Sequence, residues 1–323
     1  MMTLRKGNTG ASNAARCPPK QPAIATVEPE PNRQHLRRMR IRIKHLLLSL
    51  LLLLAGCSGL LLRPAAETAA AQLPAGVAVT EGSILSSTGC TLDYRLYQGG
   101  AAEGGALVVL AHGFLRSQKR MRTLAATLAG SGALVATLDF CNASPWDGSH
   151  AQNGLDMIRL ARALDAKRVV YAGFSAGGLA AVIAGRVDPK AIGVVTLDLV
   201  ETQGLGVRAA KGLDIPLLAL AGEPTNCNAL DNGRAVFAAT DWARVQRIVG
   251  AGHCDFEAPT DRLCELVCAD PDGDAAGSDD GRQREQIIAS STLAVRSLLD
   301  GDMLAWPDQA PRAASGPRPS AQF

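Results

Sequence analysis

Short apolar segments without polar alternation recur along this chain and restrict the folds it can adopt. Several are rich in Val and Leu, as expected of strands that are covered on both faces of a sheet. The strand candidates are Thr91–Tyr97, Ala106–Ala111, Ala133–Phe140, Arg168–Ala172, Ile192–Leu197, Pro216–Ala221 and Val245–Val249. The helical patterns are Met121–Ala129, Gly154–Leu164, Ala176–Ala184, Ala229–Ala239 and, after the last strand, Arg282–Leu299. This alternation predicts an α/β fold with one doubly wound, mostly parallel sheet in a single domain.

The N-terminal region is typical of an export signal. A basic segment precedes the apolar run Leu46–Leu54, which is too short for a membrane-spanning helix. The run ends in Leu54-Ala55-Gly56-Cys57, which matches the lipobox of bacterial lipoproteins, where the cysteine thiol accepts a diacylglycerol. The match predicts cleavage before a lipidated Cys57 and a place in the cell envelope. Ser58 after the cysteine favours the outer membrane of a Gram-negative cell. The alternative is a signal anchor, or an ordinary cleaved signal with a chance cysteine.

These signals divide the chain into five predicted parts. Residues 1–38 form an extension that is disordered or reflects a start codon assigned too early, and residues 39–56 form the lipoprotein signal peptide. Residues 57–75 are an Ala-rich lipidated tether, residues 76–302 are the folded domain, and residues 303–323 are a disordered tail.

The predicted export of the protein indicates that its cysteines form disulfides. Six remain once Cys17 in the leader and Cys57 are set aside: Cys90, Cys141, Cys227, Cys254, Cys264 and Cys268. An even number in an exported protein predicts disulfides, although the sequence does not select their pairing. Cys264 and Cys268 are spaced as neighbours on a helix face and are expected to bond elsewhere. Zinc-type ligand spacings are missing, so no metal site is predicted.

Charge argues against a nucleic-acid partner. The formal net charge is only +3, and a cluster of the basic residues precedes the apolar run. The rest of the chain offers no basic surface of the kind that binds DNA or RNA. Hydrophobic residues make up 47% of the chain and charged residues 20%, which is ordinary for a globular protein.

Ser175 lies in Gly173-Phe174-Ser175-Ala176-Gly177, a G-x-S-x-G sequence that follows an apolar strand candidate and opens a helical pattern. This strand, turn and helix are the setting that a nucleophile elbow requires. Glycines are needed there because neighbouring backbone comes too close for a side chain. We expect Ser175 to present an exposed hydroxyl at the helix N-terminus as a nucleophile. The alternative is a glycine-rich helix entry with an idle serine.

Two further segments supply partners for such a serine. His112-Gly113-Phe114 follows the strand candidate Ala106–Ala111, and the loop there contributes one oxyanion donor in this type of fold. The backbone N–H groups of Phe114 and Ala176 are the predicted oxyanion hole. His112 is expected to support the loop. His253 is the only histidine after Ser175, so it is the predicted base.

The carboxylate partner of the histidine has two candidates. Asp198 and Glu223 each follow a strand candidate, at the end where the active site of such a sheet forms. Pro224 constrains the chain just after Glu223, which favours Asp198. Glu223 remains the alternative acid.

These motifs together resemble one branch of a known superfamily. The matching residues are His112-Gly113-Phe114, Gly173-Phe174-Ser175-Ala176-Gly177-Gly178, Leu197-Asp198 and Gly252-His253-Cys254-Asp255-Phe256. They look like the α/β-hydrolases that include chlorophyllases, platelet-activating-factor acetylhydrolases and dienelactone-hydrolase-like or cutinase-like esterases, over residues 80–300. The Leu-Asp context again favours Asp198. The chain departs from the pattern at Phe174, where many members have His, and at Leu199, where chlorophyllases have Pro.

The resemblance implies an α/β-hydrolase fold and hydrolysis of carboxylic esters through an acyl-enzyme, with Ser175, Asp198 and His253 as a triad and no cofactor. Only a short segment, Val200–Leu213, stands where many lipases insert a lid. We therefore expect little or no lid and an open site for a small or lipid-like ester. A thioesterase or amidase would use the same triad. A catalytically idle envelope lipoprotein that binds a ligand is the other alternative.

Overall fold

A computed structural model describes residues 73–100, 105–141, 149–268, 281–303 and 306 of the chain. The predicted extension, the signal peptide, Cys57 and most of the tether lie outside the described residues, as does nearly all of the predicted tail. Among the helices that the structure describes, none has the length and apolar character needed to cross a membrane.

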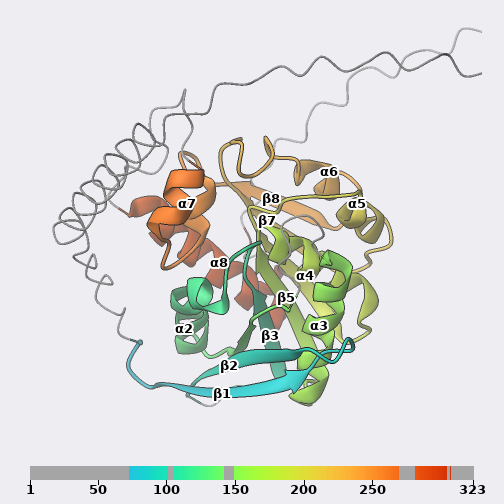
Figure 1. The fold of residues 1–323 in the computed structure, drawn as a ribbon, viewed down its shortest axis with the longest axis vertical. Helices are drawn as coiled ribbons and strands as arrows, with labels where there is room; N and C mark the ends of the chain where they lie inside the picture. The colour runs from blue at the N-terminus through green and yellow to red at the C-terminus, as the bar shows by residue number, and fades with distance from the viewer. Residues whose placement is uncertain (1–72, 101–104, 142–148, 269–280, 304–305, 307–323) are drawn as a thin grey trace, which may run out of the picture. The chain divides into compact units, whose positions relative to one another are not determined.

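One eight-stranded sheet organises the described residues, in the order β1-β2-β4-β3-β5-β6-β7-β8 (Figure 1). Strand β1 pairs antiparallel with β2, and β2 antiparallel with β4, whereas every other neighbouring pair is parallel. This confirms the predicted mostly parallel sheet. The strands are β1 Val77–Leu85, β2 Thr91–Gly99, β3 Ala106–Ala111, β4 Leu134–Leu138, β5 Arg168–Phe174, β6 Ala191–Leu197, β7 Leu217–Ala221 and β8 Ala243–Arg247.

Both faces of the sheet are covered, which explains why its central strands are continuously apolar. On one face Val108 and Leu110 of β3 pack in a cluster that includes side chains of α2 and α8. On the other face Leu107 and Val109 pack in a cluster that includes side chains of α3 and α4. The helical elements are η1 Gln118–Met121, α2 Arg122–Gly130, α3 His150–Ala163, α4 Ala176–Val187, α5 Leu205–Ala210, α6 Arg234–Phe237, η2 His253–Phe256, α7 Arg262–Val267 and α8 Arg282–Asp300.

Three departures from the sequence expectations have local causes. The helix expected over Ala229–Ala239 is reduced to the short α6, because Ala229, Leu230 and Asp231 all have positive φ and cannot continue a right-handed helix. Strand β1 was not predicted, since its residues alternate between exposed and half-buried and form no continuous apolar run. Helices α5 and α7 are each six residues long and too short for a clear periodic signal.

Three disulfides are present among the described residues: Cys90–Cys141, Cys227–Cys268 and Cys254–Cys264. Cys264 and Cys268 therefore bond elsewhere, as their helical spacing predicted.

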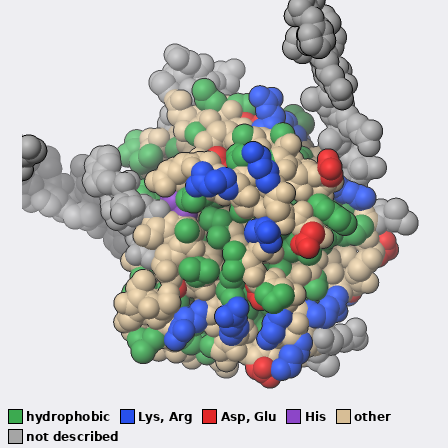
Figure 2. Space-filling model, turned by 90° about the vertical axis from the view of Figure 1, so that its right-hand side faces the viewer, with side chains coloured by type: hydrophobic (Ala, Val, Ile, Leu, Met, Phe, Trp, Pro, Cys, Tyr) green, Lys and Arg blue, Asp and Glu red, His purple; other side chains and the backbone are tan. Residues whose placement is uncertain are grey.

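Surface charge is dispersed on the face of the molecule that Figure 2 shows. Lys and Arg side chains there are interspersed with acidic, hydrophobic and other residues. Several Lys and Arg side chains lie near one another along the lower part of that face, with an acidic side chain at its edge.

Candidate active site

Ser175 lies in the sharp turn between β5 and α4. Its backbone has φ 55° and ψ −120°, a region that costs free energy for a residue with a side chain. The flanking glycines permit the turn: a Cβ on Gly173 would lie 2.2 Å from the Gly177 carbonyl oxygen, and a Cβ on Gly177 would lie 2.4 Å from the His112 carbonyl oxygen. The local structure is therefore the strained turn that the G-x-S-x-G sequence predicted.

Ser175 is more enclosed than expected. The prediction of an exposed serine is wrong for this structure, in which only 7% of the residue is accessible. The loop after β3 lies against it, so that a Cβ on Gly113 would be 3.2 Å from the Ser175 Cβ. The ring of His253 approaches from another side, which leaves little of the serine exposed.

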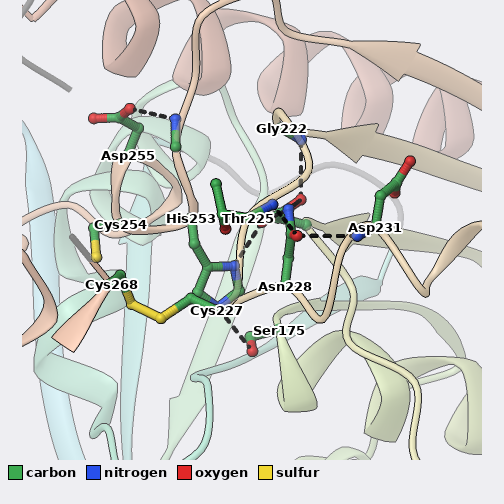
Figure 3. Close-up of polar contacts among 12 residues, drawn as sticks. Ser175, Gly222, Thr225, Cys227, Asn228, Asp231, His253, Cys254, Asp255 and Cys268 are labelled. Carbon is green, nitrogen blue, oxygen red and sulfur yellow. Dashed lines mark hydrogen bonds and ion pairs between the residues drawn. A yellow bond between two sulfur atoms is a disulfide. The ribbon is translucent and has the colours of Figure 1, made fainter. Parts of the chain in front are cut away.

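Ser175, His253 and Asp198 form one continuous chain of hydrogen bonds. Figure 3 shows the imidazole of His253 directed at Ser175. The Oγ of Ser175 lies 3.1 Å from Nε2 of His253, and Nδ1 of His253 lies 2.5 Å from Oδ2 of Asp198. The three residues follow β5, β8 and β6, so they meet at the carboxyl edge of the parallel strands. With Nδ1–H donating to the carboxylate, the Nε2 lone pair is left to accept the serine proton.

Asp198 is held by donors that fix its orientation. It is 2% exposed, and its Oδ1 accepts a hydrogen bond from the Gly222 backbone N–H at 2.9 Å. The side-chain amide of Asn228 lies 3.3 and 3.2 Å from the two carboxylate oxygens. Asn228 is fully buried, and its own oxygen accepts the backbone N–H groups of Thr225 and Asp231. Sequence reasoning missed Asn228, because no spacing pattern marks a residue whose partner lies in another loop.

Glu223, the alternative acid, contacts the segment just before His253 and not the imidazole itself. Its Oε1 accepts the backbone N–H of Gly250 at 3.0 Å, and its own N–H donates to the Ala251 carbonyl at 2.8 Å. These contacts support the chain that leads to His253. The structure therefore brings Asp198 to the imidazole and gives Glu223 no contact with the ring.

The turn that carries His253 is fixed locally. Asp255, two residues on, accepts the backbone N–H of Gly252 at 2.8 Å. Burial raises the pKa of Asp255, and the bond from Gly252 opposes part of that shift. The His253 ring also packs on Phe174, with ring centroids 4.7 Å apart. Phe174, which departs from the family pattern, thus forms one wall behind the imidazole.

Phe114 and Ala176, the predicted oxyanion donors, both line one small hollow. Ala176 is the first residue of α4, where backbone N–H groups have no partner within the helix. The Phe114 turn is closed by the Arg116 N–H, which donates to the Gly113 carbonyl at 3.2 Å.

His112 braces this turn, as the sequence suggested. The backbone N–H of Phe140 donates to its Nε2 at 3.3 Å, which leaves Nδ1–H to donate to the Gly113 carbonyl at 2.7 Å. Burial lowers the pKa of His112, so the neutral ring is the form that these contacts describe. Both ring nitrogens are therefore occupied by backbone groups.

A buried ion pair joins the loop after β3 to the segment that follows His253. Arg116 donates from Nε and Nη2 to the two oxygens of Glu257, both at 2.6 Å, and also reaches Asp261 at 2.9 Å. Glu257 is fully buried. Its pKa is raised by burial, which Arg116 partly offsets. Sequence reasoning did not single out this pair, whose members are 141 residues apart.

Two disulfides flank the same region. Cys254 directly follows His253 and bonds Cys264 of α7, and Cys227 directly precedes Asn228 and bonds Cys268. The sulfurs of Cys254, Cys264 and Cys268 lie within 4.8 Å of one another. Zinc and related ions bind thiolates, so these disulfide sulfurs do not offer a metal site.

The fold of this chain is shared with known hydrolases. No protein-family model matches the sequence, and no curated protein does. A predicted CIB-like hydrolase from Thermoplasma acidophilum is similar in structure, with a TM-score of 0.52 at 14% identity, over 69% of this chain and 100% of that one. A ferulic acid esterase from Streptomyces cinnamoneus has a TM-score of 0.53 at 19% identity, over 75% of this chain and 95% of that one. The chain therefore has the α/β-hydrolase fold.

Proposed function

We propose that this α/β-hydrolase-fold protein is a serine hydrolase that cleaves carboxylic esters through an acyl-enzyme. The observation that carries the proposal is the hydrogen-bonded chain from Ser175 through His253 to Asp198, next to two converging backbone segments. Proteins of one fold can have different functions, so the proposal rests on the residues of the site and not on the fold. The hydrogen bonds from His253 to Ser175 and to Asp198 support the roles of nucleophile, base and orienting carboxylate that acyl transfer requires.

The first half of the proposed reaction forms the acyl-enzyme. The Ser175 Oγ attacks the ester carbonyl carbon while its proton moves to Nε2 of His253. The carbonyl oxygen becomes an oxyanion, which the N–H groups of Phe114 and Ala176 stabilise. Asp198 balances the charge of the imidazolium. The bond to the alcohol oxygen then breaks, and the alcohol leaves with the proton from Nε2.

The second half returns the free enzyme. A water molecule loses a proton to Nε2 of His253 and attacks the acyl carbon. The new oxyanion occupies the same donors, the bond to the Ser175 Oγ breaks, and the serine recovers its proton. The products are a carboxylic acid and an alcohol, and no cofactor takes part.

A fluorophosphonate probe tests this proposal, because it reacts only with an activated serine. The full chain should be labelled covalently, and Ser175→Ala should abolish the labelling. Ser83→Ala, at an exposed serine of β1, is the matched control and should keep it. Labelling that survives Ser175→Ala would refute the nucleophile. A chain that is not labelled at all would support an idle ligand-binding protein, and parallel ester, thioester and amide substrates would identify the acyl bond that is cleaved.

We also propose that the chain is held in the bacterial cell envelope by a lipid on Cys57. The basic flank, the apolar run and the terminal cysteine of the lipobox support this. The disulfides of the folded part agree with an oxidising compartment outside the cytoplasm.

A further inference from the structure

The side chain of Asn228 uses its hydrogen-bonding groups on both sides, in the protein interior. It is fully buried. Its Oδ1 accepts the backbone N–H groups of Thr225 at 2.8 Å and of Asp231 at 3.0 Å, and the bond to Asp231 is drawn in Figure 3. Its Nδ2 lies 2.7 Å from the Glu223 carbonyl oxygen and 3.3 and 3.2 Å from the two carboxylate oxygens of Asp198. Because the oxygen meets two donors and the nitrogen meets three acceptors, these contacts fix the orientation of the amide.

This amide has one hydrogen left for Asp198. An NH₂ group carries two hydrogens, and the carbonyl of Glu223, its nearest acceptor, takes one of them. The other is left for the carboxylate of Asp198, whose two oxygens lie at nearly equal distances from Nδ2. A donor that is itself held on both sides therefore restrains this carboxylate from turning.

Asp198 depends on such restraint from its surroundings. Its backbone has φ 45°, in the left-handed region that residues with a side chain seldom adopt. A conformation of this kind persists where the surrounding contacts determine it. The backbone N–H of Gly222 bonds Oδ1, whereas the amide of Asn228 also reaches Oδ2. Oδ2 is the atom that faces Nδ1 of His253, so Asn228 acts on the oxygen that orients the imidazole.

The turn that carries Asn228 is anchored on both sides. The disulfide of the preceding residue ties it to the residue that ends α7. Three residues further on, Asp231 bonds the guanidinium of Arg247, which also donates to the carbonyl of Gly222. The same arginine therefore joins the two segments that supply donors to the acid. Donors that are fixed before the reaction need no reorganisation when charge develops.

We propose that Asn228 is a positioning residue, which holds the Asp198 carboxylate toward His253 while the imidazole carries a positive charge. The inference rests on the proposed function and adds a residue to its machinery. Asn228 is fully buried, so it acts through Asp198 and not on the ester itself. Loss of its hydrogen bond should weaken binding of the transition state and leave binding of the ester nearly unchanged.

Replacement of Asn228 by leucine removes the donor and keeps a side chain of similar size. With p-nitrophenyl butyrate, kcat and kcat/KM of the full chain should both fall about ten- to hundredfold, the worth of one hydrogen bond to a charged group. KM should change by less than about threefold, because an interaction made in the transition state is lost. Asn228→Ser is a second variant with less steric demand and should fall in the same range.

Asn232, four residues further along, supplies a matched control. Its side chain also joins two loops: Oδ1 accepts the Glu201 backbone N–H and Nδ2 donates to the Glu201 carbonyl, both at 2.8 Å. These bonds hold Glu201 rather than Asp198. Asn232→Leu should therefore lower the free energy of unfolding, measured by urea denaturation, and keep kcat within about threefold of the unchanged chain.

A double-mutant cycle separates positioning from a general structural role. In the chain with Asp198, Asn228→Leu should slow fluorophosphonate labelling of Ser175 about ten- to hundredfold. In a chain that already carries Asp198→Ala, the same change should slow labelling by less than about threefold, because the group through which Asn228 acts is gone.

Each result has one meaning for the inference. Three outcomes would overturn it and leave the proposed function standing. The first is a kcat in both Asn228 variants equal to that of Asn232→Leu, or a loss confined to KM. The second is a full loss that persists without Asp198. The third is failure of both Asn228 variants to fold, which would assign Asn228 to the turn alone. A chain that neither reacts with the fluorophosphonate nor cleaves any ester would overturn the proposed function, and the inference with it.

Discussion

Removal of Arg116 should destabilise the protein far more than removal of a similar arginine at the surface. Arg116 is 10% exposed and bonds both oxygens of the fully buried Glu257. Arg116→Met therefore leaves a carboxylate without its partner in the protein interior, which costs about 3–5 kcal/mol in the free energy of unfolding. Arg95, paired with the 70% exposed Glu81, is the matched control, and Arg95→Met should cost at most about 1 kcal/mol.

The loss of stability in Arg116→Met should increase as the pH rises. Burial already raises the pKa of Glu257, and loss of the guanidinium raises it further. A carboxyl group whose folded-state pKa lies above its unfolded-state value contributes stability at low pH and loses it as the pH rises through the folded-state value. The cost of Arg116→Met should therefore be largest at neutral pH and smaller at mildly acidic pH.

Urea denaturation followed by circular dichroism at pH 7 and pH 5 measures both quantities. The double variant Arg116→Met with Glu257→Leu should recover much of the loss, since it removes the buried charge as well. Turnover should fall in Arg116→Met, because the loop after β3 is no longer joined to the segment that follows His253. A loss below about 1 kcal/mol at pH 7, equal to that of Arg95→Met, would refute the reasoning.

Two other predictions concern the proposed acid and the anchor. Asp198→Asn should lower kcat by about ten-thousand-fold, as the same change does in a serine-protease triad, whereas Glu223→Gln, with folding checked by circular dichroism, should leave most of the activity. The reverse ranking in one ester assay would make Glu223 the acid. Cys57→Ser should release the chain from the membrane fraction and stop incorporation of labelled palmitate, and unchanged incorporation would contradict the lipobox interpretation.

Local patterns were enough to predict most of the architecture. Strand β3 begins and ends where the apolar run does, and β5 to β7 agree within a few residues, because strands buried on both faces must be apolar throughout. Edge strand β1 was not predicted, because one of its faces is exposed to solvent and its residues form no continuous apolar run. The expected helix from Ala229 failed because three residues there adopt left-handed backbone conformations, which periodicity does not reveal.

The candidate site, like the fold, could be predicted from the sequence only in part. The sequence by itself determined Ser175 and its elbow, because the glycines, the strand and the helix that build it are contiguous, and it left His253 as the only histidine beyond the serine. The sequence favoured Asp198 over Glu223, and the tertiary structure brings Asp198 to the imidazole. Only the tertiary structure decided that Asn228 contacts Asp198 and that Arg116 pairs with Glu257. Those contacts join loops at the ends of different strands. Their partners are set by how the strands are ordered in the sheet and by how the loops pack above it, and no short stretch of sequence encodes that.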